Sequence, residues 1–186
     1  MEGLMVGDAI DRLGLVRDFV NTLDLEEEKE SVPTPEALAA WLAGRGLLSN
    51  DERISADEHS LALATRERIR RMLLANNGEP SHPEDLEALD SLAAEAAVTA
   101  RFRSGGMRLE PRATGTVGAL GRILAVIAEA MAEGNWTRLK ACSSHTCQWA
   151  FFDRSKNHSA HWCSMQTCGN RAKARQFRQR RRAGEP

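Results

Sequence analysis

Tyrosine is absent from this sequence of 186 residues, and all aromatic residues together make up 5% of it. Because alanine and leucine are abundant instead, the composition favours helices. No stretch approaches the roughly 20 consecutive apolar residues of a membrane-spanning helix. Residues 1–11 carry acidic side chains and no basic segment, which argues against a secretory signal. We therefore expect a cytoplasmic protein with no membrane partner.

Motifs of common enzyme classes are also missing. The sequence contains no glycine-rich phosphate loop, no HExxH pattern and no nucleophile elbow. It also offers no nucleophile beside an activating base. We therefore expect that the protein is not an enzyme.

Cysteine is missing from residues 1–141, and the four cysteines of the chain lie in one short window. In a reducing cytosol, clustered cysteines are more often metal ligands than disulfides. Two C-x4-C pairs separated by fifteen residues can supply the closed four-thiolate shell of a structural Zn²⁺ ion. His158 or His161 could replace one thiolate, but four thiolates suffice. The predicted zinc ligands are Cys142, Cys147, Cys163 and Cys168.

Charge divides the chain into two predicted domains, residues 1–137 and residues 138–186. The first contains fourteen basic and twenty-four acidic residues. From Arg138 to Arg182, eleven basic residues stand against one acidic residue, Asp153. Such a one-sided charge indicates that the second domain binds a polyanionic partner, which the acidic first domain would repel.

The N-terminal domain is predicted to be helical with one small β-hairpin. Serine residues at positions 55 and 81, each followed three residues later by glutamate, resemble capping boxes. Alternating apolar and polar residues around Ser104-Gly105-Gly106 predict the hairpin. The predicted helices cover about 8–23, 35–43, 56–76, 83–96 and 115–132.

Three polar residues share one face of the first predicted helix: Asp18, Asn21 and Thr22. Their spacing makes them neighbours. They could contact a ligand or a partner, or they could hydrogen-bond nearby loop backbone. The sequence leaves both interpretations open.

The C-terminal domain is predicted to be a β-hairpin followed by a basic helix. We expect residues 148–152 and 159–162 to form the hairpin around a turn at 153–157. Trp149, Phe151 and Trp162 should pack around the metal. The helix begins either at a Ser164 cap, which we favour, or at Asn170, and Ala174 and Phe177 should pack back toward the metal.

The basic side chains of this domain predict a nucleic-acid interface. Arg171, Arg175, Arg178 and Arg182 follow helical spacing and lack acidic partners in sequence. Duplex DNA is the expected partner. RNA, or a redox-sensing or protein-interaction role for the thiolates, are the alternatives. The predicted contacts are Arg154, Lys156, Arg171, Lys173, Arg175, Arg178, Arg180, Arg181 and Arg182.

Several segments resemble the CGNR zinc-finger family, whose four-residue motif stands here at 168–171. The matching segments are 136–142, 147–149, 152–155 and 162–173. Residues 18–22, with the segment around Trp41, resemble the ABATE domain that commonly precedes this finger. One departure is visible, since Ala160-His161 stands where the family typically has two arginines.

The resemblance implies a bacterial transcriptional regulator, induced by stress, whose cysteines bind zinc and whose basic helix contacts DNA. The N-terminal domain would then sense or couple a signal. Because one finger has limited reach, sequence selectivity would require a homodimer through that domain. The expected fold is mainly α, ending in a treble-clef-like zinc finger.

Overall fold

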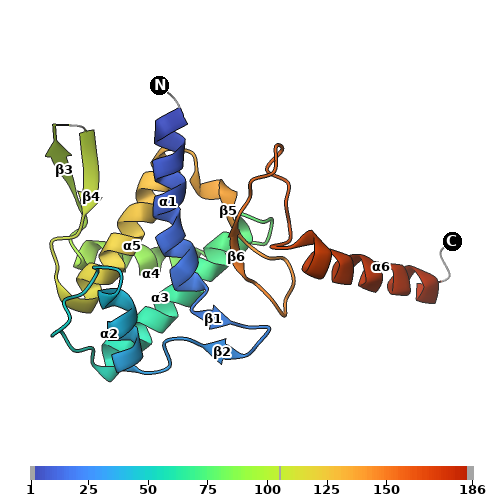
Figure 1. Ribbon diagram of the computed structural model, residues 1–186, viewed down its shortest axis with the longest axis horizontal. Helices are drawn as coiled ribbons and strands as arrows, with labels where there is room; N and C mark the ends of the chain where they lie inside the picture. The colour runs from blue at the N-terminus through green and yellow to red at the C-terminus, as the bar shows by residue number, and fades with distance from the viewer. Residues whose placement is uncertain (1–2, 105, 184–186) are drawn as a thin grey trace.

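The computed structural model describes the backbone of residues 3–104 and 106–183, and the side chains of residues 12–104 and 106–180. Within these ranges the chain forms six α-helices and three two-stranded antiparallel sheets, which confirms the mainly α prediction (Figure 1). The helices are α1 (Gly3–Val20), α2 (Pro35–Ala43), α3 (Ala56–Ala75), α4 (Pro83–Glu95), α5 (Gly115–Ala132) and α6 (Asn170–Ala183).

Helix α5 lies in the hydrophobic core, between α1, α4 and the hairpin strand β4 (Gly106–Glu110). Leu120 and Ile123 are fully buried against apolar side chains of the other helices. Gly121 permits the close approach, because a Cβ there would lie 2.5 Å from the Cβ of Ala96. Among the described residues, α5 is the one helix long and apolar enough to cross a membrane, and much of it is buried inside the protein.

The predicted helix starts are mostly confirmed. Thr34 caps α2 by accepting a hydrogen bond from the amide of Ala37, and Ser55 forms a capping box with Glu58 at α3. The capping box predicted at Ser81 is wrong. His82 is the N-cap of α4, and its side chain makes no capping hydrogen bond.

The predicted hairpin of the N-terminal region is confirmed as β3 (Thr99–Arg103) paired with β4. A second, shorter pairing joins β1 (Leu23–Asp24) to β2 (Lys29–Glu30) and holds the acidic run between them as a loop. We name residues 25–28 the β1–β2 loop.

The hairpin predicted for the C-terminal region is wrong in its second strand. Strand β6 (Ala150–Phe152) pairs with β5 (Leu139–Ala141) rather than with residues 159–162. The physical reason is burial: Leu139 and Ala141 pack into the core with the N-terminal helices, which places β5 beside β6. Segment 153–160 instead forms a loop.

The predicted boundary between two domains at residue 137 stays a prediction.

Helix α6 projects away from the rest of the molecule (Figure 1). Its described side chains are exposed, except for the half-buried Ala172. The expectation that Ala174 and Phe177 pack toward the metal is therefore wrong, since 63% of Phe177 is exposed. Helix α6 points away from the cysteine cluster, and its first turn is the part that lies near the cysteines (Figure 1).

Candidate metal centre and basic helix

The four cysteines converge, with all four Sγ atoms within 4.8 Å of one another. Cys163 Sγ lies 3.6 Å from Cys147 Sγ and 3.8 Å from Cys168 Sγ. These distances are too long for a disulfide, whose sulfurs are about 2.0 Å apart. A tetrahedral zinc ion with Zn–S bonds of about 2.3 Å places its sulfurs about 3.8 Å apart. The donor set and its geometry therefore fit a bound zinc ion.

Apolar rings shield the sulfurs from water. Cys142, Cys147 and Cys168 are buried, and Trp149, Phe151 and Trp162 pack against them, as expected. A hydrogen bond with Cys147 lowers the pKa of the Cys142 thiol, whereas burial raises the pKa of the Cys163 thiol. A bound metal ion would deprotonate all four thiols, because coordinated cysteine is held as thiolate.

The second cysteine pair leads directly into the basic helix. Ser164 accepts a hydrogen bond from the amide of Thr167 and caps a π-helical turn at Met165–Gly169, which runs on into α6. This agrees with the favoured prediction of a start at Ser164. Cys168 lies in that turn, so a metal ion bound there would hold the base of α6.

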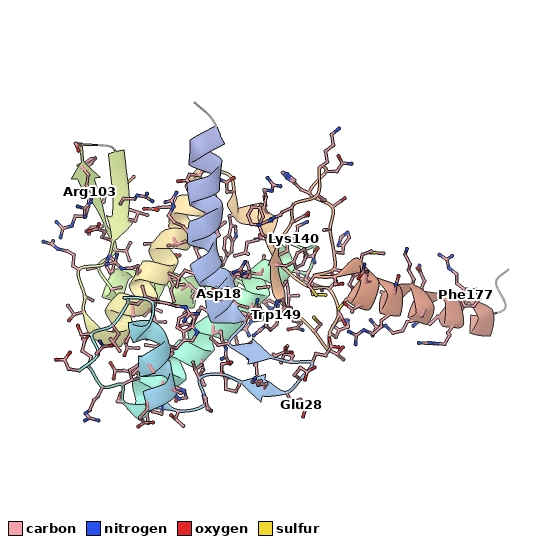
Figure 2. All side chains as sticks on the ribbon, viewed as in Figure 1. Asp18, Glu28, Arg103, Lys140, Trp149 and Phe177 are labelled. Atoms are coloured by element: carbon pink, nitrogen blue, oxygen red, sulfur yellow. The ribbon has the colours of Figure 1, made fainter. Side chains whose placement is uncertain are left out.

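Lys140 of β5 and Asp153, at the start of the 153–160 loop, form a buried ion pair. Lys140 Nζ lies 2.7 Å from Asp153 Oδ2 and also donates to the carbonyl of His158. Burial alone would raise the pKa of Asp153, but hydrogen bonds from Lys140 and the amides of Ser155 and Ala160 outweigh it and lower that pKa. This pair, which sequence reasoning missed, orders the loop that carries Arg154 and Lys156 (Figure 2 labels Lys140).

Side chains from residues before position 138 hydrogen-bond to the backbone of the segment from residue 138 onward, which we call the finger. Asn21 both donates to the carbonyl and accepts from the amide of Ala150, at 2.9 and 2.8 Å. Arg70, of which 1% is exposed, donates to the carbonyls of Gln148 and Val20. Asn77 Nδ2 lies within hydrogen-bonding distance of Ala141 O, Ser143 Oγ and His161 O. We name Asn21, Arg70 and Asn77 the tether residues.

Sequence reasoning missed Arg70 and Asn77. The available signal was that Arg70 lies on α3 between the buried Ile69 and Leu73, where an arginine must find partners inside the protein. Asn77 follows the end of α3 and resembles an ordinary loop residue, so no sequence signal marks it.

The predicted cluster of Asp18, Asn21 and Thr22 comes together on the wall of a cavity of about 610 Å³. Thr22 is buried and accepts a hydrogen bond from Arg66. Asp18 is partly exposed and pairs with Arg17 on the same helix. Asn21 therefore has an intramolecular role, whereas Asp18 faces an open space.

The predicted nucleic-acid residues lie on two elements. Arg154 and Lys156 are exposed on the 153–160 loop. The described basic side chains of α6 are exposed and surround the helix (Figure 2). Arg171 pairs with Glu26 of the β1–β2 loop at 2.7 Å. Arg181 and Arg182 belong to the α6 backbone, but their side chains lie outside the described residues.

Comparison with known protein families supports this architecture. The CGNR zinc finger matches residues 138–181, and the ABATE family, described as "Putative stress-induced transcription regulator", matches residues 13–134. No curated protein matches the chain. The chain therefore belongs to the ABATE family and carries a CGNR zinc finger at its C-terminal end.

Proposed function

We propose that this protein is a cytoplasmic, zinc-dependent transcription regulator that binds duplex DNA through α6 and has no enzymatic activity. The observation that carries the proposal is the helix itself. Seven of its fourteen residues are basic and none is acidic. Among the residues with described side chains, Arg171 is the one α6 cation paired with an acidic residue.

Such a helix is suited to a phosphate backbone. A helix of fourteen residues is about 21 Å long and narrow enough to enter the major groove. Arg171, Arg175 and Arg178 lie on one face of α6, and Lys173 and Arg180 lie on the opposite face. The like charges at i, i+4 repel one another, and phosphate contacts would relieve that repulsion.

A bound metal ion would fix the position of the first turn of this helix. Zn²⁺ would be held by the four cysteines and would supply a rigid link between the β5–β6 strands and the base of α6. The tether residues hold those strands against the helical body. The acidic N-terminal region would keep the body away from the duplex and so restrict the direction of approach.

A selection from random duplex DNA with zinc-loaded protein tests the proposal. We expect a preferred sequence whose affinity falls steeply as salt increases. Replacing Arg175 or Arg178 by glutamine should weaken binding and reduce the slope of log affinity against log salt by about one for each phosphate that is no longer neutralised. Arg122→Gln, an exposed change on α5, is the matched control and should change neither quantity.

Structured RNA is the comparison partner, because the same charges could serve it. Clear preference for RNA with no selected DNA site would overturn the proposal. Equal, salt-sensitive binding to every duplex, unaffected by changes in α6, would also overturn it.

A further inference from the structure

The cavity beside the cysteine cluster has walls from two parts of the chain. Helices α1 and α2 contribute one side, including Asp18 and Trp41. The finger contributes the other through Trp149, Arg154 and Cys163 (Figure 2 labels Asp18 and Trp149). We name this space the Trp41–Trp149 cavity. Its volume of about 610 Å³ falls within the range typical of small-molecule sites, about 300–1,000 Å³.

The aromatic content of the walls indicates a planar ligand. Two tryptophans and two phenylalanines line the cavity, although the whole chain has only four tryptophans and five phenylalanines. Arg45 already stacks over the Trp41 ring, 3.7 Å from its centre. A flat molecule could stack on the indoles or on the guanidinium in the same way.

The charges of the walls indicate an anion. Three arginines line the cavity, and Arg17 is paired with Asp18. Arg45 and Arg154 form no ion pair with any residue whose side chain the structure describes. Four thiolates around a bound Zn²⁺ would carry a net charge of about −2 next to Cys163, so direct contacts with the guanidinium groups must hold an anion in the cavity. Two arginines thus remain available for a carboxylate or a phosphate.

We propose that the Trp41–Trp149 cavity binds a small, planar aromatic anion. Such a ligand would touch the helical body and the finger at once. It would therefore add a second link between them, beside the tether residues. The site does not depend on whether α6 binds DNA, so the two proposals fail separately.

Titration of the zinc-loaded full-length protein tests the site, with the four tryptophan indole N–H signals followed by NMR. Two probes represent the two sources of such chemistry, 2-naphthoate for aromatic carboxylic acids and adenosine monophosphate for nucleoside phosphates. At least one should shift the signals of Trp41 and Trp149 saturably, and leave that of the buried Trp136 unchanged. The probe that binds more tightly identifies the source.

Charge recognition is tested by two comparisons. The uncharged 2-naphthamide should bind about tenfold more weakly than 2-naphthoate, and adenosine should bind about tenfold more weakly than its phosphate. Arg45→Gln and Arg154→Gln should each weaken the better probe by about tenfold, since each removes a charged contact. Arg122→Gln, remote from the cavity, should leave its affinity unchanged.

Three results would overturn the proposal. One is the absence of saturable shifts in either indole with both probes up to about 5 mM, a concentration at which even weak sites fill. Another is equal affinity for the charged and uncharged members of each pair. The third is displacement of the bound probe by a short DNA duplex that itself contacts the indoles of Trp41 and Trp149. The cavity would then be part of a nucleic-acid surface.

Discussion

Strand β5 and helix α6 belong to the same zinc-finger segment but have opposite surroundings. Each β5 residue is at most 5% exposed, and Lys140 is among them. In α6, every described side chain except Ala172 is exposed. Strand β5 is held by the core and by Asn77, whereas α6 is held at its base by Cys168 and the Arg171–Glu26 pair. The comparison shows that the cysteine cluster joins a buried element to an exposed one that is held only near its base.

The helix has little stability of its own. Isolated helices shorter than about 12–15 residues are marginal in water, and repulsion between neighbouring arginines weakens this one further. Its position therefore depends on the metal centre, and substitutions can remove each attachment in turn.

Replacing Cys163 by serine should have the largest effect. It removes one of four ligands from a metal ion whose binding contributes about 10 kcal/mol or more to folding such sites. We expect loss of the bound ion and of α6 helicity, measured by metal content and circular dichroism. The control is His161→Ser, because this histidine is outside the sulfur cluster. Retention of the ion by Cys163→Ser, or its loss from His161→Ser, would contradict the assigned ligands.

Replacing Asp153 by asparagine should destabilise the protein by about 3–5 kcal/mol, because Lys140 is left charged and buried without its partner. Urea unfolding measures this free energy, and Asp90→Asn, an exposed change on α4, serves as control. Since the pKa of Asp153 is lowered in the folded protein, the pair is fully stabilising above about pH 4 and loses its effect as pH falls further. The difference between the two proteins should thus be equal at pH 7 and pH 5; a marked fall at pH 5 would refute the ion pair.

Replacing Asn77 by alanine should cost about 1–3 kcal/mol, since it leaves buried carbonyls of the finger without a donor. Asn77→Asp should cost more, because it places a carboxylate against the carbonyl oxygens of Ala141 and His161. Asn50→Ala, in an exposed loop, provides the matched control in urea unfolding. If aspartate were tolerated better than alanine, Asn77 would not be a donor to the finger.

Replacing Glu26 by glutamine should have the smallest effect. Exposed ion pairs contribute about 0–1 kcal/mol, so freeing Arg171 should strengthen DNA binding by no more than about fivefold. The gain should be visible at low salt and disappear at high salt. Fluorescence anisotropy with the selected duplex measures it, with Glu87→Gln on α4 as control. Weaker binding by Glu26→Gln would mean that the pair positions Arg171 for DNA instead of competing with it.

Local signals in the sequence were sufficient for much of this fold. Ser55 marks a helix start because a cap acts within one turn. The C-x4-C spacing predicted the sulfur cluster without any tertiary information. The pairing of β5 with β6 was not predictable in this way. It follows from burial of Leu139 and Ala141 among helices distant in sequence, which no local pattern encodes.

Polar side chains were the harder part of the site. Lys140 looks like a surface cation in the sequence, yet it is buried and paired with Asp153. For Asn21 the sequence leaves a ligand contact and a backbone contact open, and its partner is the finger backbone of the same chain. Such assignments need the three-dimensional structure because their partners lie far away along the sequence.

Hydrogen exchange before and after metal chelation tests the central claim most directly, because it reports β5 and α6 in the same molecule. We predict that chelation removes amide protection from residues 170–180, while α3, α5 and β5 stay protected. Unchanged protection of α6 in metal-free protein would contradict the account, because the helix would then be held by something other than the four cysteines.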